Sequence, residues 1–293
     1  MATMPVVVGV DGSEESLRAA EWAAREASRH EAALRIVSAP AMPPRMWTHD
    51  TAPQGVARVL GAAPRRALGD AIARSRGVTS DLLIDAELLT GPPALAVTSS
   101  GSGALMLAVG ARGAGGFAAM LLGSVSRYAA MHSSCPVVVV REETGAVHGE
   151  IAVGIRDSHD SATALSFAFE EAALRGATLV AVHAWYWFPP VFGEPWAREI
   201  PARLSDPAKI SAHAGEHLTE MLCRWREKYP TVPVRHDVVH GHPGRVLASY
   251  TARADLVVIG RHDGHHAGPA VGAVQHAVLS HAHGPVTIIP ARS

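Results

Sequence analysis

Lysine is nearly absent from this chain. Lys209 and Lys228 are the only lysines among 293 residues, so arginine carries almost all of the positive charge. The P-loop of nucleoside triphosphatases needs a Gly-Lys-Ser or Gly-Lys-Thr sequence, and none occurs here. The scarcity of lysine therefore excludes a P-loop. It also excludes a Schiff-base or phosphate-binding lysine from the first half of the chain.

Cysteine, net charge and long apolar runs are scarce as well. Cys135 and Cys223 are too few and too far apart for a disulfide framework or a thiolate metal site. The net charge of −1, with histidine neutral, offers no electrostatic footprint for nucleic acid or an anionic membrane. No stretch of about 18 uncharged apolar residues exists, and the N-terminus lacks the basic and apolar regions of a signal peptide. We therefore expect a cytoplasmic protein with no nucleic-acid or membrane partner.

The first half of the chain alternates short apolar runs with amphipathic segments. Hydrophobic residues make up 48% and charged residues 18%, which is typical of a globular protein, and the length favours two domains. Strands are expected at 5–10, 34–39, 82–88, 104–109 and 137–140, and helices at about 14–30, 56–76, 91–100 and 123–133. Pro64 could interrupt the second helix. This alternation predicts an α/β fold in which helices cover both faces of a parallel sheet.

The same order begins again near residue 150. Strands are expected at 150–155, 179–184, 234–239, 256–260 and 286–289, with helices at 162–174, 210–229 and 272–283. Pro136 and Pro285 are 149 residues apart, and Gly91 and Gly241 are 150 apart. A period of this length indicates two copies of one domain, since solenoid repeats are about 20–50 residues long. We place the first copy at 1–143 and the second copy at 149–293, joined by a short polar linker.

Residues 107–127, LAVGARGAGGFAAMLLGSVSR, form the segment of the first copy best suited to an anion. An apolar strand ends in Gly110, Gly113 follows, and a helix is expected to begin at Gly123-Ser124. Glycine lets backbone N–H groups approach a phosphate, and a helix N-terminus adds partial positive charge. We therefore predict that this loop binds the phosphates of a nucleotide.

Other candidate residues belong to the same edge of the predicted sheet. Ligands of open parallel sheets bind beyond the carboxyl ends of the strands, where the strand order reverses. Asp11 follows the first strand and could accept a hydrogen bond from a ribose hydroxyl, although Asp11-Gly12-Ser13 is also typical of a turn with a helix cap. Arg112, inside the loop, is either a charge-assisted phosphate contact or a solvated arginine.

The spacing Gly-x2-Gly-x9-Gly-Ser and the opening VVVGVDGSEES resemble the universal stress protein family, and the resemblance covers the chain twice. It implies a tandem protein of two Rossmann-like five-stranded parallel sheets, each in the order 3-2-1-4-5. The fifth strands would pair the copies as a pseudo-dimer, and a homodimer through edge strands would be a further step. The family's nucleotide-binding members bind ATP, with Mg²⁺ held mainly by phosphates and water. By resemblance Asp11 contacts ribose and adenine, the Ala39 backbone contacts adenine, and the phosphate site comprises Gly110, Gly113, Gly123, Ser124, Val125 and Ser126.

The second copy departs from this pattern. Arg156 stands where the first copy has Asp11, Asp263 replaces Gly113 and Ala273 replaces Ser124. A cation cannot accept a ribose hydrogen bond, and a carboxylate in the phosphate loop repels the ligand unless Arg156, Arg261 or a metal offsets it. We therefore predict that the second copy binds ATP weakly or not at all. The histidines of segment 262–266 could form a metal site or an exposed loop.

The residues expected around the glycine loop at 107–127 indicate which function the protein has. No general base, lysine or Ser/His/Asp arrangement is fitted to it, so no catalytic residue and no protein-held metal are predicted. We expect an ATP-binding regulatory or stress-response module without substantial turnover, acting on a regulatory protein partner that the sequence does not identify. A slow ATPase or other nucleotide hydrolase and a nucleotide-free interaction scaffold are the alternatives.

Overall fold

The computed structural model describes residues 4–40, 54–114, 121–141, 147–156, 161–186, 206–261 and 272–291. In the first copy the elements are β1 Val6–Gly9, α1 Glu14–Arg29, β2 Leu34–Ser38, α2 Gln54–Val78, β3 Ile84–Leu88, α3 Pro93–Ser100, β4 Met106–Gly110, α4 Ser124–His132 and β5 Val137–Val140. In the second copy they are β6 Glu150–Gly154, α5 Ala162–Arg175, β7 Thr178–Trp185, α6 Pro207–Lys228, β8 Val234–His240, α7 Pro243–Tyr250, β9 Leu256–Gly260, α8 Ala273–His281 and β10 Val286–Ile289.

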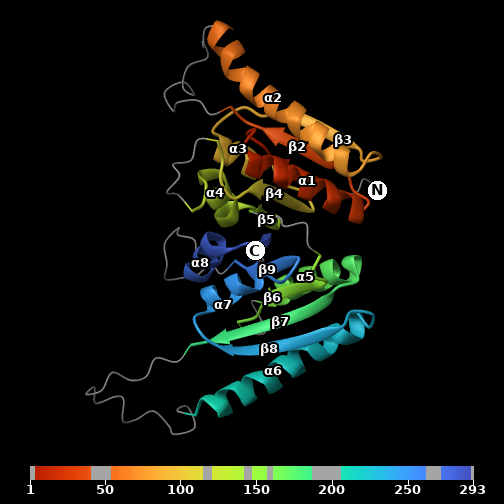
Figure 1. Ribbon diagram of the computed structural model, residues 1–293, viewed down its shortest axis with the longest axis vertical. Helices are drawn as coiled ribbons and strands as arrows, with labels where there is room; N and C mark the ends of the chain where they lie inside the picture. The colour runs from red at the N-terminus through yellow and green to blue at the C-terminus, as the bar shows by residue number, and fades with distance from the viewer. Residues whose placement is uncertain are drawn as a thin grey trace, which may run out of the picture.

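The strands form one continuous sheet in the order β3-β2-β1-β4-β5-β10-β9-β6-β7-β8. Pairing is parallel inside each copy, and β5 pairs antiparallel with β10 where the copies meet. The predicted order 3-2-1-4-5 and the pseudo-dimer are thus confirmed. Because the fifth strands pair within the chain, β3 and β8 are the outer strands, and a homodimer through edge strands would have to use these. Figure 1 shows α2 beyond one end of the sheet and α6 beyond the other.

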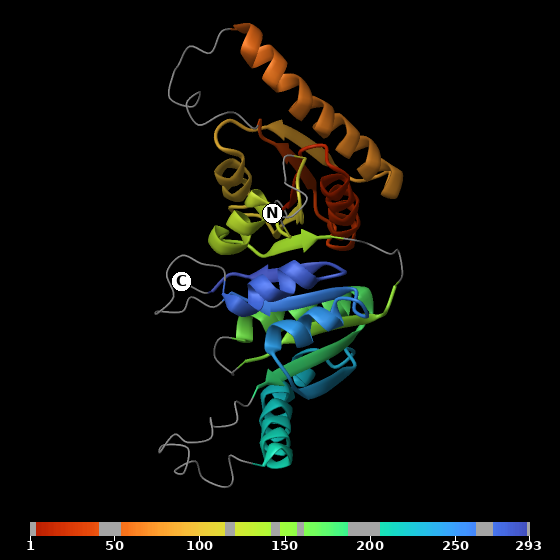
Figure 2. The same ribbon diagram turned by 60° about the vertical axis from the view of Figure 1, so that its left-hand side comes forward.

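The helices cover both faces of this sheet. One core joins the sheet to α1, α2, α5 and α6, and a second core joins the opposite face to α3, α4, α7 and α8. Strands buried on both faces, such as β1 with its three valines at 0% exposure, account for the uninterrupted apolar runs in the sequence. Figure 2 shows the same layers from another side, with α2 and α6 again at opposite ends.

Two helices differ from the sequence-based expectation. The helix α2 continues through Pro64 without interruption, and this proline is buried. One proline removes one backbone donor, which a long helix that packs on a sheet can tolerate. The helix α7 was not predicted, although Gly241-His242-Pro243 repeats the Gly91-Pro92-Pro93 signal that precedes α3. Both helices carry proline in their first turn, where no intrahelical donor is lost.

A cluster of buried charges connects α1 of the first copy to α5 of the second. His30 Nε2 lies 2.9 Å from Glu171 Oε1, and Arg175 lies 2.7 Å from Glu26 and 3.0 Å from Glu171. Glu26 and Glu171 occupy equivalent positions 145 residues apart, as do His30 and Arg175. Each copy therefore contributes one carboxylate, and His30 and Arg175 each reach across to the other copy's carboxylate; Arg29 of the first copy also pairs with Glu26.

No helix in the described segments is long and apolar enough to span a bilayer.

Candidate functional site

Asp11 joins the start of α1 to the loop after β4. Its Oδ1 accepts hydrogen bonds from Ser13 N at 3.0 Å and Ser13 Oγ at 2.6 Å, and its Oδ2 accepts one from Ala114 N at 2.8 Å. A Cβ at Gly113 would collide with Asp11 Oδ2. Glycine at 113 therefore makes room for the carboxylate, so two residues 102 positions apart in the sequence form one structural unit.

Gly110 ends β4 where α1 approaches most closely. A Cβ there would lie 2.7 to 2.8 Å from the backbone atoms of Glu15 and Ser16 in the first turn of α1. The packing of α1 on β4 alone therefore requires glycine at this position. We predicted that glycine at this position lets the backbone approach a phosphate. The structure shows a second requirement for glycine, which is the close approach of α1 to the end of β4.

The first turn of α4 carries the remaining predicted phosphate ligands. Gly123 is its N-cap and has no side-chain acceptor, so the free N–H groups of the first turn face no capping oxygen. Ser124 is exposed and Val125 is half-buried. Ser126 is buried, and its hydroxyl donates to Gly110 O at 2.7 Å. Ser124 thus remains available to a ligand, whereas Ser126 holds α4 against the end of β4.

Arg112 extends from the loop to α1. Its guanidinium donates to Glu15 Oε1 at 3.0 Å, and its side chain is 43% exposed. An exposed ion pair of this kind contributes about 0–1 kcal/mol, so an anion could displace Glu15 at small cost. Because Asp11 and Glu15 both place carboxylates at this edge, a polyphosphate bound here would need a counter-cation.

Ala39 follows β2 at the same edge and is half-buried. Next to it, Ser38 is buried and donates from Oγ to Val10 O at 2.7 Å, which ties the end of β2 to the end of β1. The structure therefore brings Ala39 and Asp11 to neighbouring strand ends. Residues 115–120, the middle of the glycine loop, lie outside the described residues.

The second copy keeps the scaffold of this site but changes its surface. Arg156 N bonds to Ser161 Oγ at 3.3 Å, as Asp11 N bonds to Ser16 Oγ at 3.3 Å. Gln275 Nε2 donates to Gly260 O at 3.0 Å, which is the bond that Ser126 makes in the first copy. A Cβ at Gly272 would collide with the Gln275 side-chain oxygen. A polar oxygen therefore lies beside the start of α8.

Arg261, which the sequence offered as a counter-charge to Asp263, donates to Ser133 O of the first copy at 2.8 Å, so it contributes to the contact between copies. Asp263 and the histidines of segment 262–266 lie outside the described residues.

One cluster in the described part of the chain brings three groups that could ligate a metal within 4.8 Å of one another. It consists of Glu26, His30 and Glu171 at the contact between the copies. Arg175 donates hydrogen bonds to both carboxylates, so the protein itself compensates their charge. This cluster is an ion-pair network, and sequence reasoning did not find it because its members belong to different copies.

Comparisons with known proteins agree with the repeat. The sequence model described as the universal stress protein family matches residues 3–141 and again 149–290. The universal stress protein Rv2005c of Mycobacterium tuberculosis is 35% identical over 97% of this chain and 96% of the relative. A universal stress protein of Mycolicibacterium smegmatis is 33% identical over 98% and 97%. The crystal structure of a universal stress protein from Archaeoglobus fulgidus covers 99% of this chain and 97% of its own, with a TM-score of 0.71; at 15% identity this likeness concerns the fold alone.

Proposed function

Since the chain belongs to the universal stress protein family as two tandem copies, we propose that it is an ATP-binding regulatory module of the stress response that holds the nucleotide mainly in its first copy. The observation that carries this proposal is the contact between Asp11 and the loop after β4. Asp11 Oδ2 accepts from Ala114 N across Gly113, so the carboxylate for a ribose and the loop for phosphates adjoin.

The ligand would bind along the carboxyl edge of the first copy. A ribose hydroxyl would replace Ser13 or Ala114 as a donor to Asp11, and the adenine would contact the backbone at Ala39. The phosphates would lie against the open first turn of α4, with the Ser124 hydroxyl and the Gly123 end nearby. Mg²⁺ would lower the repulsion between the phosphates and the carboxylates of Asp11 and Glu15, held mainly by phosphates and water.

The same site supports binding better than turnover. Among the described residues the carboxylates that reach the edge already have partners, Asp11 with Ser13 and Ala114, and Glu15 with Arg112. Asp11 would keep a ribose hydroxyl as its partner in the bound state, and no described histidine or lysine lies beside these carboxylates to serve as a general base. We therefore propose a protein whose nucleotide-bound and nucleotide-free states are distinguished by a regulatory partner, with hydrolysis slow at most.

Isothermal titration with ATP and Mg²⁺ tests the proposal. We expect about one site per chain, and we expect Asp11→Ala to weaken it at least tenfold because a charge-assisted hydrogen bond contributes about 1.5–3 kcal/mol. The matched control is Asp70→Ala, which removes an exposed carboxylate from α2. Two equal sites per chain would contradict the assignment to the first copy.

Two further measurements separate the alternatives. Mass spectrometry of nucleotide released from the purified, denatured protein identifies the ligand, and titration with AMP or cAMP separates adenosine recognition from triphosphate recognition. Steady release of ADP above background, lost in a Ser124→Ala variant, would favour the slow hydrolase instead. Absence of any bound or binding nucleotide would favour the interaction scaffold.

A further inference from the structure

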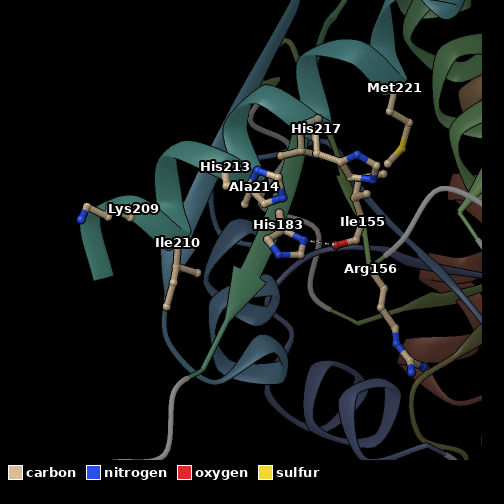
Figure 3. Close-up of a pocket in the computed structure, with 10 residues that line it drawn as sticks. Ile155, Arg156, His183, Lys209, Ile210, His213, Ala214, His217 and Met221 are labelled. Carbon is tan, nitrogen blue, oxygen red and sulfur yellow. Dashed lines mark hydrogen bonds between the residues drawn. The ribbon is translucent and has the colours of Figure 1, made fainter. Parts of the chain in front are cut away.

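A pocket of about 710 Å³ lies in the second copy, between the ends of β6 and β7 and the facing side of α6 (Figure 3). Its described lining comes from these three elements. It is of the size that binds small organic molecules.

Among the described residues that line this pocket, every charged or titratable side chain is basic. Arg156 comes from the end of β6, His183 from β7, and Lys209, His213 and His217 from α6. Figure 3 shows the three imidazoles between Lys209 at one end and Arg156 at the other. Lys209 is 71% exposed and lies 3.8 Å from Asp206, the N-cap of α6, outside the lining. The described lining holds no carboxylate, so its electrostatics favour an anion.

The orientation of His183 is fixed by the backbone. Its Nδ1 lies 3.0 Å from Ile155 O, and because a carbonyl oxygen can only accept, Nδ1 carries the hydrogen. The other nitrogen, Nε2, is then left for the pocket and can donate to an anion only when the ring is protonated. In the first copy the equivalent bond is made by the Ser38 hydroxyl to Val10 O. The second copy has thus replaced a small hydroxyl by an imidazole with a second nitrogen.

The helix α6 contributes both polarity and an apolar floor. His213 and His217 are four residues apart, so both lie on the face that lines the pocket. Leu218 and Met221, one turn further along, are 2% and 6% exposed. Ile155 forms the buried end of the opposite wall. A basic rim above an aliphatic floor suits a molecule with a charged oxygen group and an apolar body.

We propose that this pocket binds a small organic anion, an aliphatic or aromatic compound ending in a carboxylate or phosphate group. The oxyanion lies among His183, His213 and His217, and the apolar body lies against Leu218 and Met221. Imidazole N–H groups and the Arg156 guanidinium donate hydrogen bonds to the oxyanion, and Lys209 adds positive charge at the rim.

A metal ion fits this pocket less well than an anion. Among the described residues, the one group of three potential ligands within 4.8 Å lies elsewhere, at Glu26, His30 and Glu171. Arg156 and Lys209 would also repel a cation. The proposal is independent of nucleotide binding by the first copy, because no described residue of that copy lines the pocket.

The test is calorimetric titration of the full chain with four probes that share an eight-carbon body: octanoate, octyl phosphate, octanol and octylammonium. We expect one site per chain for octanoate, octyl phosphate or both, at least about tenfold tighter than for octanol or octylammonium. The carboxylate and phosphate arms distinguish the two sources of oxyanion. Equal affinity for octanol or octylammonium would overturn the proposal.

Variants locate the site. His213→Ala with His217→Ala should weaken binding about tenfold or more; both side chains are exposed and alanine favours helix, so the fold is retained. The matched control is Arg224→Ala, which removes an exposed basic group of α6 outside the lining. The same result in a Gly113→Asp background would separate this site from the nucleotide site. Unchanged binding in the histidine double variant, displacement of octanoate by AMP, or tight binding of Zn²⁺ at these histidines would contradict the proposal.

Discussion

The two copies keep the same internal hydrogen bonds and present opposite charge to a ligand. After the first strand, Asp11 N and Arg156 N bond to the serine of the following helix at the same distance of 3.3 Å. The side chain at this position is a carboxylate in the first copy and a guanidinium in the second. The hydrogen bonds that hold this edge of the sheet together are the same in both copies, while the side chain at this position has the opposite charge. The two copies therefore share a scaffold and differ at its surface.

The start of the last helix gives the same contrast. Ser126 and Gln275 both bond to the carbonyl that ends the neighbouring strand, Gly110 O and Gly260 O respectively. The serine leaves the helix N-terminus open, whereas the glutamine places its own oxygen beside Gly272. The second copy thus places a side-chain oxygen where the first copy has none, at the position of its proposed phosphate site.

The largest expected effect concerns the equivalent positions His30 and Arg175. Arg175→Ala leaves Glu171 without a permanent counter-charge and leaves Glu26 with Arg29 alone, and an unpaired buried charge costs about 3–5 kcal/mol. His30→Ala removes a group that bonds to only one carboxylate, so its cost should be smaller. Urea unfolding measures both, with Arg74→Ala as the control because its ion pairs are exposed and contribute about 1 kcal/mol or less. Equal costs for Arg175→Ala and Arg74→Ala would show that the cluster does not stabilise the contact between copies.

A second variant, Gly113→Asp, gives the first copy the residue that the second copy has at the equivalent position, Asp263. Gly113→Asp introduces a Cβ that displaces the Asp11 carboxylate, and it adds a negative charge to the loop. We expect ATP affinity to fall by about 100-fold or more, since both a lost contact and a repulsion contribute. Calorimetry measures this, and Gly69→Asp is the matched control because no atom lies within 4 Å of a Cβ there. If Gly113→Asp bound ATP as the unchanged protein does, the loop would not be the phosphate site.

The charge cluster also predicts how stability depends on pH. Burial raises the pKa of Glu26 to about 7 despite the charge of Arg175, and the hydrogen bond to Glu171 raises the pKa of His30. In both cases the folded protein holds the proton more tightly than the unfolded chain, so stability is lost as the pH rises. The Glu26 contribution is lost between about 4.5 and 7, and that of His30 above 6.5.

The pKa of Glu171 is shifted in the opposite direction. Burial favours its neutral form, but the hydrogen bond from His30 and the charge of Arg175 outweigh burial and lower the pKa. Its contribution is therefore lost only in acid, below pH 4.5. We expect the urea midpoint to be higher at pH 6 than at pH 8, by the equivalent of about 1 kcal/mol. His30→Gln should reduce this difference, and a midpoint that rises between pH 6 and pH 8 would contradict the assignment.

The sequence was sufficient for the fold because the strands are buried on both faces. Such strands are continuous apolar runs, and their recurrence after about 145 to 150 residues identified two copies, whereas the family resemblance implied the order 3-2-1-4-5. Local sequence signals were insufficient where packing determines the structure, as at Pro64, which lies inside a continuous helix. The pairing of His30 with Glu171 was invisible because it joins residues 141 positions apart. His183 and His213 drew no attention in the sequence because only the fold brings β7 and α6 to one pocket.

The smallest expected effect separates a residue that touches the ligand from one that positions the helix. By resemblance Ser124 and Ser126 both belong to the phosphate site, yet Ser124 is exposed while Ser126 is buried and bonded to Gly110 O. Ser126→Ala should therefore lower the free energy of unfolding by about 1 kcal/mol and change the Kd for ATP little. Ser124→Ala should weaken ATP binding several-fold and leave stability nearly unchanged. Urea unfolding and calorimetry of both variants measure the two effects. The reverse pattern would mean that α4 rotates when the ligand binds, because only then could the Ser126 hydroxyl reach a phosphate.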